Sequence, residues 1–371
     1  MVSSTEKAFL MNKKVILVRM GGEIGIKSRQ TRRRMVNILK RNIKTILAEF
    51  TGYRVIDFRD RLIIYHELNN DLNEVAQLIV NSISGISSVS IANVVQATEP
   101  AIISGGLSVA IVIIQPNKSF AVRVRREGNH PYSSMDIARK VGAKVLSSQM
   151  VGITVDLDNP DHEIWIDIRG SLAFIFSSTL RGMDGIPSRS QGTAIALIRP
   201  NLNSIIAAWL MKKRGVNIIP VFFRTGKQSE EEFKNYLQSE FNNIPIDISI
   251  EDLLKTFKSQ YSLCLLCTIF CEQICQKMAA QEQISAIISP TCFDYNNEII
   301  SLKALKFLEK KAFISVLRPI QFGFFSQGLN IEYLDHKSCC HHRSKVSLQL
   351  LEDFDETLLN SFLSFKSGSS I

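Results

Sequence analysis

Residues 119–146 read SFAVRVRREGNHPYSSMDIARKVGAKVL, and this stretch predicts a strand, a loop and a helix in succession. Phe120 to Val124 is rich in β-branched and aromatic residues, which favour strands. Ser133 or Ser134 can cap the helix that follows, because a serine hydroxyl accepts a hydrogen bond from the first turn. The stretch therefore predicts part of a mixed unit of strands and helices.

The flanking sequence extends this unit on both sides. Ala110 to Ile114 is a further β-rich run, and strands are expected over Gly152 to Leu157, Glu163 to Ile168 and Leu172 to Phe176. Strands and helices alternate within about 85 residues, a pattern typical of one compact mixed sheet.

A small α+β unit is predicted before it. Val15 to Met20 reads as a strand, and from about Thr31 the apolar residues recur at helical spacing with a basic outer face. A hairpin over residues 55–65, a helix over Leu72 to Ile83 and a strand over Val89 to Val95 complete this unit.

A different pattern begins near Thr193. Ala194 to Ile198 reads as a buried strand, Ser204 to Arg214 as a helix and Val216 to Phe223 as another strand, with further helices expected near residues 229–241 and 263–280. This alternation predicts a doubly wound α/β domain. We therefore expect an α/β chain with domains over 1–95, 96–180 and 181–350 and a tail over 351–371.

Positive charge is concentrated at the start of the chain. Residues 1–60 hold 14 basic and five acidic residues, so they carry the whole formal charge of +9, and the remainder is neutral in sum. Arg123 and Arg125 add a second basic cluster, and alternation along their strand puts both on one face. A field of this kind indicates a nucleic-acid partner, and a solvated helix face is the alternative.

Other protein classes are less compatible with the composition. Apolar residues make up 45% and charged residues 21%, which is globular composition. The longest apolar stretch, near residues 101–115, is too short to span a bilayer and contains a Gly-Gly pair. We expect a cytoplasmic protein without a membrane partner.

Seven cysteines all lie in the last third of the chain, at positions 264, 267, 271, 275, 292, 339 and 340. Such clustering in a large chain indicates metal binding, redox chemistry or burial rather than a disulfide framework. The first four follow at spacings of three, four and four, which makes a single helical stripe and leaves a packed thiol face as an alternative.

Several motifs together resemble a known family. Val18-Arg19, Gly22-Glu23-Ile24, Lys27 and the arginine run that follows are similar to the N-terminal ferredoxin-like domain of tRNA 4-thiouridine synthetase. Residues 120–126, 133–135 and 139–143 resemble its THUMP domain. Residues 155–161 and 181–187, Gly192, and residues 207–211 and 213–216 continue the match into the third domain. The resemblance covers nearly the whole chain.

The resemblance implies a fold, an activity and a partner. The fold would be a ferredoxin-like unit, a THUMP α+β domain and a Rossmann-like parallel-sheet domain of the ATP-pyrophosphatase type. The family sulfurates a uridine in tRNA, with a link to thiamine biosynthesis, and its first two domains grip the acceptor end. We expect basic side chains to contact tRNA, namely Lys27, Arg29, Arg32, Arg33, Arg34, Arg123, Arg125, Arg126, Arg139, Lys140 and Arg181.

The expected nucleotide loop departs from the family pattern. The family has Ser-Gly-Gly-x-Asp-Ser, whereas this chain has Arg199-Pro200-Asn201-Leu202-Asn203-Ser204. Proline lacks an N–H, and an asparagine Cβ blocks the close approach of phosphate that glycine permits. Farther along, Ser289-Pro290-Thr291-Cys292 replaces a Thr-Gly-Glu segment. We therefore expect Arg199, Asn201, Asn203 and Ser204 to form a degenerate site and activation by ATP and magnesium to be lost.

The cysteines match the family better. The resemblance implies that Cys264, Cys267 and Cys340, or Cys339 in its place, hold an iron–sulfur cluster or carry persulfide chemistry. Zinc is the alternative metal, because His341 or His342 could complete a Cys3His site. Cys340, or Cys339, would deliver sulfur.

The expected function is that of a tRNA-binding protein of this family, which transfers sulfur to a tRNA uridine. A sulfur donor protein is a further expected partner, and a homodimer is one possible assembly. The alternatives are a non-catalytic tRNA-binding module and a sulfur-relay subunit, each acting with an active partner.

Overall fold

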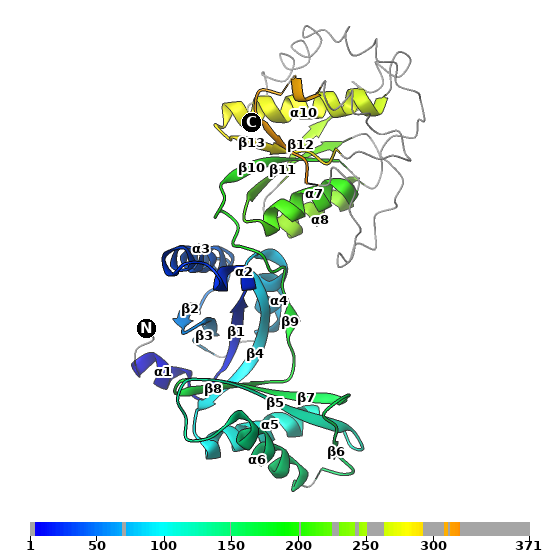
Figure 1. Cartoon of the computed structure of the whole chain (residues 1–371). Helices are drawn as coiled ribbons and strands as arrows, with labels where there is room; N and C mark the ends of the chain where they lie inside the picture. The colour runs from blue at the N-terminus through cyan, green and yellow to red at the C-terminus, as the bar shows by residue number, and fades with distance from the viewer. Residues whose placement is uncertain are drawn as a thin grey trace. The chain divides into compact units, whose positions relative to one another are not determined.

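The computed structural model describes residues 4–68, 72–148, 150–199, 202–224, 230–241, 245–250, 263–291, 308–310 and 312–319. The chain divides into two compact units, Met1–Pro187 and Ser188–Ile371. Each unit is built around its own sheet (Figure 1).

Nine described strands form the sheet of the first unit, in the order β2-β3-β1-β4-β8-β7-β5-β6, with β9 paired to β4. Their bounds are β1 (Lys14–Met20), β2 (Tyr53–Phe58), β3 (Arg61–His66), β4 (Ile86–Gln96), β5 (Ser119–Glu127), β6 (Thr154–Val155), β7 (His162–Arg169), β8 (Leu172–Phe176) and β9 (Leu180–Arg181). The helices are α1 (Ser4–Leu10), α2 (Gly22–Gly25), α3 (Arg29–Leu47), α4 (Asn73–Ser82), α5 (Glu99–Ile113) and α6 (Ser134–Leu146).

Strand β4 joins the two halves of this unit. It pairs antiparallel with β1 along most of its length and with β8 near its end, so one strand closes the first half and opens the second. The boundary expected near residue 95 falls within β4. The two halves therefore share a continuous sheet.

Local sequence explains the two long amphipathic helices. In α3, the buried residues Met35, Leu39, Ile43 and Leu47 recur every four positions, which makes one apolar stripe. Helix α6 begins with a capping box in which the Ser133 side chain accepts from the backbone N–H of Asp136. The predicted cap and the predicted helix are both confirmed.

Two strands expected from the sequence differ in the structure: the first is part of a helix, and the second is shorter than expected. Ala110–Ile114 reads as β-rich, but residues 110–113 end helix α5. Glycines explain the close packing of α5: a Cβ at Gly105 would lie 2.6 Å from Ile175 Cδ1, and one at Gly106 would lie 2.6 Å from Val141 Cγ1. Packing against the sheet thus overrides local β propensity. The strand expected over residues 152–157 is reduced to β6.

Among the described helices, none is both long enough and apolar enough to cross a membrane.

The sheet of the first unit has two different faces. Helices α3, α4, α5 and α6 pack on one face and enclose two apolar clusters. Among the described helices only α1 packs on the other, which we call the open face. Strand register places on it the side chains of Val15, Leu17, Arg19, Arg61, Ile63, Ser88, Ser90, Ala92, Val94, Arg123, Arg125, Trp165, Asp167, Arg169, Phe174, Phe176 and Arg181.

The second unit has a parallel sheet, whose five described strands run in the order β12-β11-β10-β13-β14. They are β10 (Thr193–Ile198), β11 (Asn217–Arg224), β12 (Ile246–Ser249), β13 (Ala286–Ile288) and β14 (Ser315–Leu317). Helices α7 (Leu202–Lys213) and α8 (Glu230–Phe241) pack on one face, and α10 (Leu263–Gln281) packs on the other. The doubly wound domain expected from the sequence is confirmed.

We predict that Phe174→Ala destabilises the first unit. Phe174 has no exposed surface, and its ring packs edge-on against that of Phe58 at 5.8 Å between centroids. Truncation of a buried phenylalanine costs about 3–5 kcal/mol of unfolding free energy. Urea denaturation followed by circular dichroism measures the change. The control Val112→Ala alters a side chain that is 83% exposed, and it should stay within about 0.5 kcal/mol of wild type.

Candidate nucleic-acid interface

Arginines from separate strands meet on the open face. Arg19 comes from β1, Arg125 from β5 and Arg181 from β9. Arg19 and Arg181 both lie in register with Ser88 of β4, on its two sides, and Arg125 lies in register with Asp167. The fold thus collects positive charge from three parts of the chain.

Two aromatic rings support these guanidinium groups. Arg125 lies over the Trp165 ring at 5.3 Å from its centroid, and Arg19 lies over the Phe176 ring at 4.7 Å. The two rings are stacked at 6.4 Å with an interplanar angle of 8°. Cation–π contact holds each charge at a fixed place on the face, which a free arginine side chain does not achieve. We call these four residues the arginine–aromatic stack.

Arg19 is the more deeply placed of the two arginines. Its Nη1 donates to the hydroxyl of Ser90 at 3.1 Å and to that of Ser88 at 3.4 Å. Burial lowers the pKa of Arg19 to about 10, and Asp167 opposes this shift. The group therefore remains charged at neutral pH, in surroundings that would stabilise an added anion.

The predicted tRNA-contacting residues do not all converge. Arg123 and Arg181 lie on the open face with Arg125, but Arg123 is bound to Glu163 at 2.9 Å and to the Leu157 carbonyl at 2.7 Å. Arg126 points to the opposite face and donates to the Gly128 carbonyl.

The other predicted basic side chains belong to the helical side of the unit. Arg29, Arg32, Arg33 and Arg34 lie in α3, with Lys27 just before it, and Arg139 and Lys140 lie in α6. Lys140 is paired with Glu99. Sequence reasoning missed Arg19, Trp165 and Phe176 as a group, because only strand register brings them together.

Parallel sheets bind ligands at a characteristic place, and the second unit has the corresponding strand order. Such sites lie beyond the carboxyl ends of two strands at which the strand order reverses. Here the reversal lies between β10 and β13. The residues that follow these strands are Arg199 and Ser289, which is where the degenerate nucleotide site was expected.

The described side chains at this place bind one another. The Arg199 backbone N–H donates to the Ser204 hydroxyl at 3.0 Å, and its guanidinium donates to the Thr268 hydroxyl at 3.2 Å. All three residues are buried. Asn203 is exposed at the start of α7, and Asn201 lies outside the described residues.

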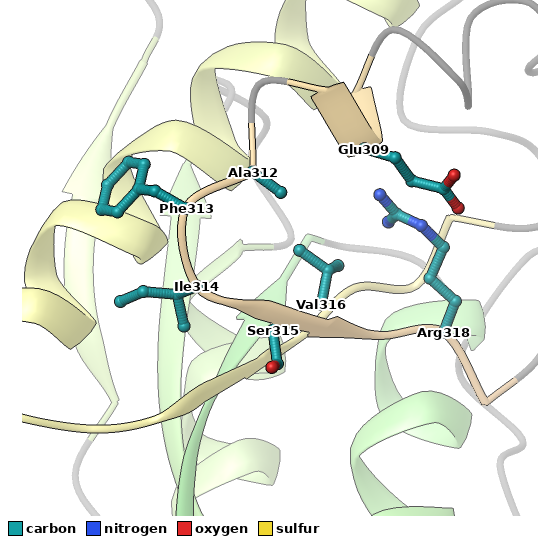
Figure 2. A pocket seen from close by; sticks show the side chains of 7 residues that line it. All are labelled: Glu309, Ala312, Phe313, Ile314, Ser315, Val316 and Arg318. Atoms are coloured by element: carbon teal, nitrogen blue, oxygen red, sulfur yellow. The ribbon is translucent and has the colours of Figure 1, made fainter.

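A buried ion pair lies beside Ser289 and Thr291, which follow β13. The Glu272 carboxylate, which has no exposed surface, accepts two hydrogen bonds from the Arg318 guanidinium. It also accepts from the hydroxyls of Ser289 and Thr291 at 2.5 and 3.2 Å. Arg318 borders a cavity of about 430 Å³ that is also lined by Glu309 and residues 312–316 (Figure 2).

These residues do not fit ATP with magnesium. Arg199 and Ser204 bind to neighbouring protein groups, and the buried carboxylate is neutralised by an arginine of the same chain. A phosphate cradle instead needs several backbone N–H groups directed at the ligand. We therefore derive no nucleotide-dependent step from these residues.

The three cysteines whose side chains are described form the packed thiol face that the sequence analysis gave as an alternative to metal binding or redox chemistry. Cys267, Cys271 and Cys275 are fully buried on α10 against the sheet, and the Cys267 and Cys271 sulfurs lie 3.9 Å apart. Burial raises the pKa of Cys271 and of Cys275 well above 9, so both remain thiols at neutral pH.

The cluster expected from Cys264, Cys267 and Cys340 is only partly visible. The Cys264 side chain, Cys339 and Cys340 lie outside the described residues. Within the described part of the chain, no three histidine, cysteine or acidic side chains are grouped to hold a metal ion. Cys267 is fully buried within the apolar cluster between α10 and the sheet.

We predict that these three thiols resist alkylation in the native protein. At pH 8, iodoacetamide should leave Cys267, Cys271 and Cys275 unmodified, because all three are buried and inaccessible to the reagent, and because burial raises the pKa of Cys271 and of Cys275. All three should react after denaturation in guanidinium chloride. Peptide mass spectrometry locates the label at each position. Native labelling of Cys271 as fast as that of a free thiol would contradict the placement of this stripe.

Comparison with known proteins agrees with the architecture of the first unit. Residues 15–90 match the model of the ThiI ferredoxin-like domain, and residues 109–178 match that of the THUMP domain. The expected ferredoxin-like unit and THUMP domain are therefore confirmed.

Relatives were found among tRNA sulfurtransferases. A probable tRNA sulfurtransferase of Methanosarcina mazei is 35% identical over 226 residues, which cover 59% of this chain and 54% of the relative. The match thus spans about half the length of that relative. A probable tRNA sulfurtransferase of Methanocaldococcus jannaschii is 27% identical over 336 residues, or 85% of this chain and 86% of the relative.

Solved structures extend the likeness to both units. PH1313 from Pyrococcus horikoshii is 27% identical, with a TM-score of 0.64 over 83% of this chain and 95% of that one. A 4-thiouridine synthetase solved with RNA and ATP has a TM-score of 0.66 over 84% of this chain and 82% of that one. At 21% identity, the latter likeness concerns the fold. The chain therefore carries a ThiI-type ferredoxin-like domain followed by a THUMP domain, and it is similar to tRNA sulfurtransferases.

Proposed function

We propose that this chain binds tRNA through its first unit and serves in the sulfuration of a tRNA uridine. The observation that carries the proposal is the arginine–aromatic stack on the open face, with Arg181 at its border. The relatives named tRNA sulfurtransferases support tRNA as the ligand.

Phosphate is the part of RNA that this face would bind. Guanidinium groups match phosphate oxygens in geometry and charge. Arg125 is exposed, and its guanidinium lies over the Trp165 ring. Contacts of this kind fix the position of an RNA without reading its sequence.

Long-range attraction comes from the rest of the unit. The 14 basic residues among the first 60 include the exposed side chains of Lys27, Arg29, Arg33 and Arg34 beside or on α3. A concentrated field accelerates the encounter with a polyanion, and short-range contacts then determine how it is held. We assign this role to α3.

Sulfur delivery remains assigned to Cys340 or Cys339. The described thiols of α10 are buried, and the raised pKa values of Cys271 and Cys275 exclude them as nucleophiles at neutral pH. An iron–sulfur cluster held by Cys264, Cys267 and Cys340 remains a proposal that would require Cys267 to leave its present packing.

The second candidate is a tRNA-binding protein without ATP chemistry of its own. The observation in its favour is that described polar groups near the ends of β10 and β13 bind one another: Glu272 is paired with Arg318, and Arg199 is bound to Thr268. A separate active subunit would then activate the uridine.

We predict that Arg125→Ala weakens tRNA binding by about tenfold at low salt, the size of one charge-assisted hydrogen bond. The slope of log K against log salt should also fall by about one. Arg123→Ala should have a smaller effect, because that side chain is already bound to Glu163. Filter-binding titrations between 50 and 200 mM KCl measure both quantities.

Lys118→Ala is the matched control for this comparison. It removes the same charge just before β5, where Lys118 is paired with Asp161. Equal losses of affinity for Arg125→Ala and Lys118→Ala would indicate a general charge effect and count against the open face.

We predict no tRNA-dependent release of AMP by the purified chain with ATP and magnesium. The reason is that the described residues Arg199 and Ser204 bind to neighbouring protein groups, and that Pro200 supplies no backbone N–H for a phosphate. Chromatography of radiolabelled ATP incubated with the chain and unmodified tRNA is the measurement. Release of AMP that requires tRNA would exclude the second candidate and assign uridine activation to this chain.

A further inference from the structure

A buried carboxylate lies beneath the arginines of the open face. Asp167, in β7, has only 3% of its side chain exposed. The Arg169 Nε donates to one of its oxygens at 2.7 Å, and the Arg61 Nε donates to the other at 3.4 Å. Arg61 belongs to the ferredoxin-like half and Arg169 to the THUMP half, so one carboxylate binds a guanidinium from each.

Two further carboxylates complete the surroundings of these two arginines. Asp60 is paired with Arg61 at 2.5 Å and with Arg169 at 3.4 Å, and Glu127 is paired with Arg169. The side chains of Arg61 and Arg169 are only 12% and 10% exposed. They are therefore structural cations and are poorly placed to contact RNA.

The two arginines of the stack lie directly beside this group. Arg19 is in register with Arg61, and Arg125 is in register with Asp167. Arg61, Arg125 and Arg169 all lower the pKa of Arg19, which means that they repel its charge, whereas Asp167 raises it. The Asp167 carboxylate thus offsets repulsion among four neighbouring guanidinium groups.

We propose that Asp167 is a positioning residue of the tRNA-binding face, which holds the little-exposed Arg61 and Arg169 in place and thereby fixes Arg19 and Arg125 beside them on the open face. The inference rests on the proposed tRNA binding. Asp167 itself does not touch RNA. It acts through the arginines, at the place where the two halves of the unit meet.

For the variant Asp167→Asn, a positioning role predicts a change in tRNA affinity opposite in sign to the change that the net charge alone would cause. Asp167→Asn removes one negative charge, so a protein that bound RNA only through its overall field would bind more tightly and with a steeper salt dependence. A positioning role predicts weaker tRNA binding despite the more positive charge, because the uncharged asparagine has one acceptor oxygen in place of the two that Arg61 and Arg169 bind.

The test compares Asp167→Asn with Glu49→Gln in the full chain, using unmodified tRNA in filter-binding titrations between 50 and 200 mM KCl. Glu49 is an exposed carboxylate just after α3, so its variant has the same added positive charge. We expect at least fivefold weaker binding for Asp167→Asn, and unchanged or slightly tighter binding for Glu49→Gln. Unchanged or tighter binding by Asp167→Asn overturns the inference.

Arg61→Lys keeps the charge but cannot make the same directed contacts to Asp60 and Asp167. It should also weaken binding, and it decides the question if circular dichroism shows that Asp167→Asn has not folded. Wild-type affinity of a folded Arg61→Lys protein overturns the inference in that case.

A readout without RNA separates this inference from the proposed function. In wild type, the Nε–H signals of Arg61 and Arg169 should be protected from solvent exchange in NMR spectra, and a folded Asp167→Asn protein should lose that protection. Retained protection would overturn the positioning role. A wild-type chain that does not bind tRNA would instead contradict the proposed function, while the Nε–H signals would still report on Asp167.

Discussion

The hydrogen bonds on both sides of strand β4 are the constraint on which the first unit depends. One edge of β4 pairs with β1 and the other with β8, so two small α+β units become one sheet. Sheet register then fixes, residue by residue, which side chains from the two halves share a face. The arginines of β1, β5 and β9 meet because of this pairing, although they are far apart in the sequence.

The position of the helices has a functional consequence. All four long helices of the first unit pack on one face and supply the apolar clusters that stabilise it. The other face is covered in part by α1 and carries a third apolar cluster beside its charged residues. The charged residues therefore gather on the face that the four long helices leave uncovered, beside an apolar cluster that also stabilises the unit.

The buried carboxylates of the two units differ in how fully neighbouring arginines balance their charge. In the first, one positive charge is in excess, because four arginines lie together with three carboxylates, namely Arg19, Arg61, Arg125 and Arg169 with Asp60, Glu127 and Asp167. In the second, Glu272 is matched by Arg318 and by two hydroxyls, so the group is satisfied within the protein. A buried carboxylate is costly unless it is paired and hydrogen-bonded. An excess of arginine attracts an external anion, whereas a complete internal pair does not.

The sequence by itself determined the elements and the order of the domains. The stripe of Met35, Leu39 and Ile43 predicted α3, and the alternation after Thr193 predicted the parallel sheet, because these patterns depend on local periodicity. It failed for residues 110–113, where β-branched side chains favoured a strand and packing of α5 selected a helix. The cysteine spacing likewise predicted a helical stripe but left open whether the thiols bind metal or pack.

Only the tertiary structure decided which of the basic residues act together. Arg19, Arg125, Trp165 and Phe176 belong to four strands, and nothing in their local sequence specifies their register. Asp167 contacts Arg61 across 106 positions of the chain. Such contacts arise from strand pairing over long separations, whereas local propensity acts over a few residues, and for this reason the composition indicated an anionic partner but could not locate the surface that binds it.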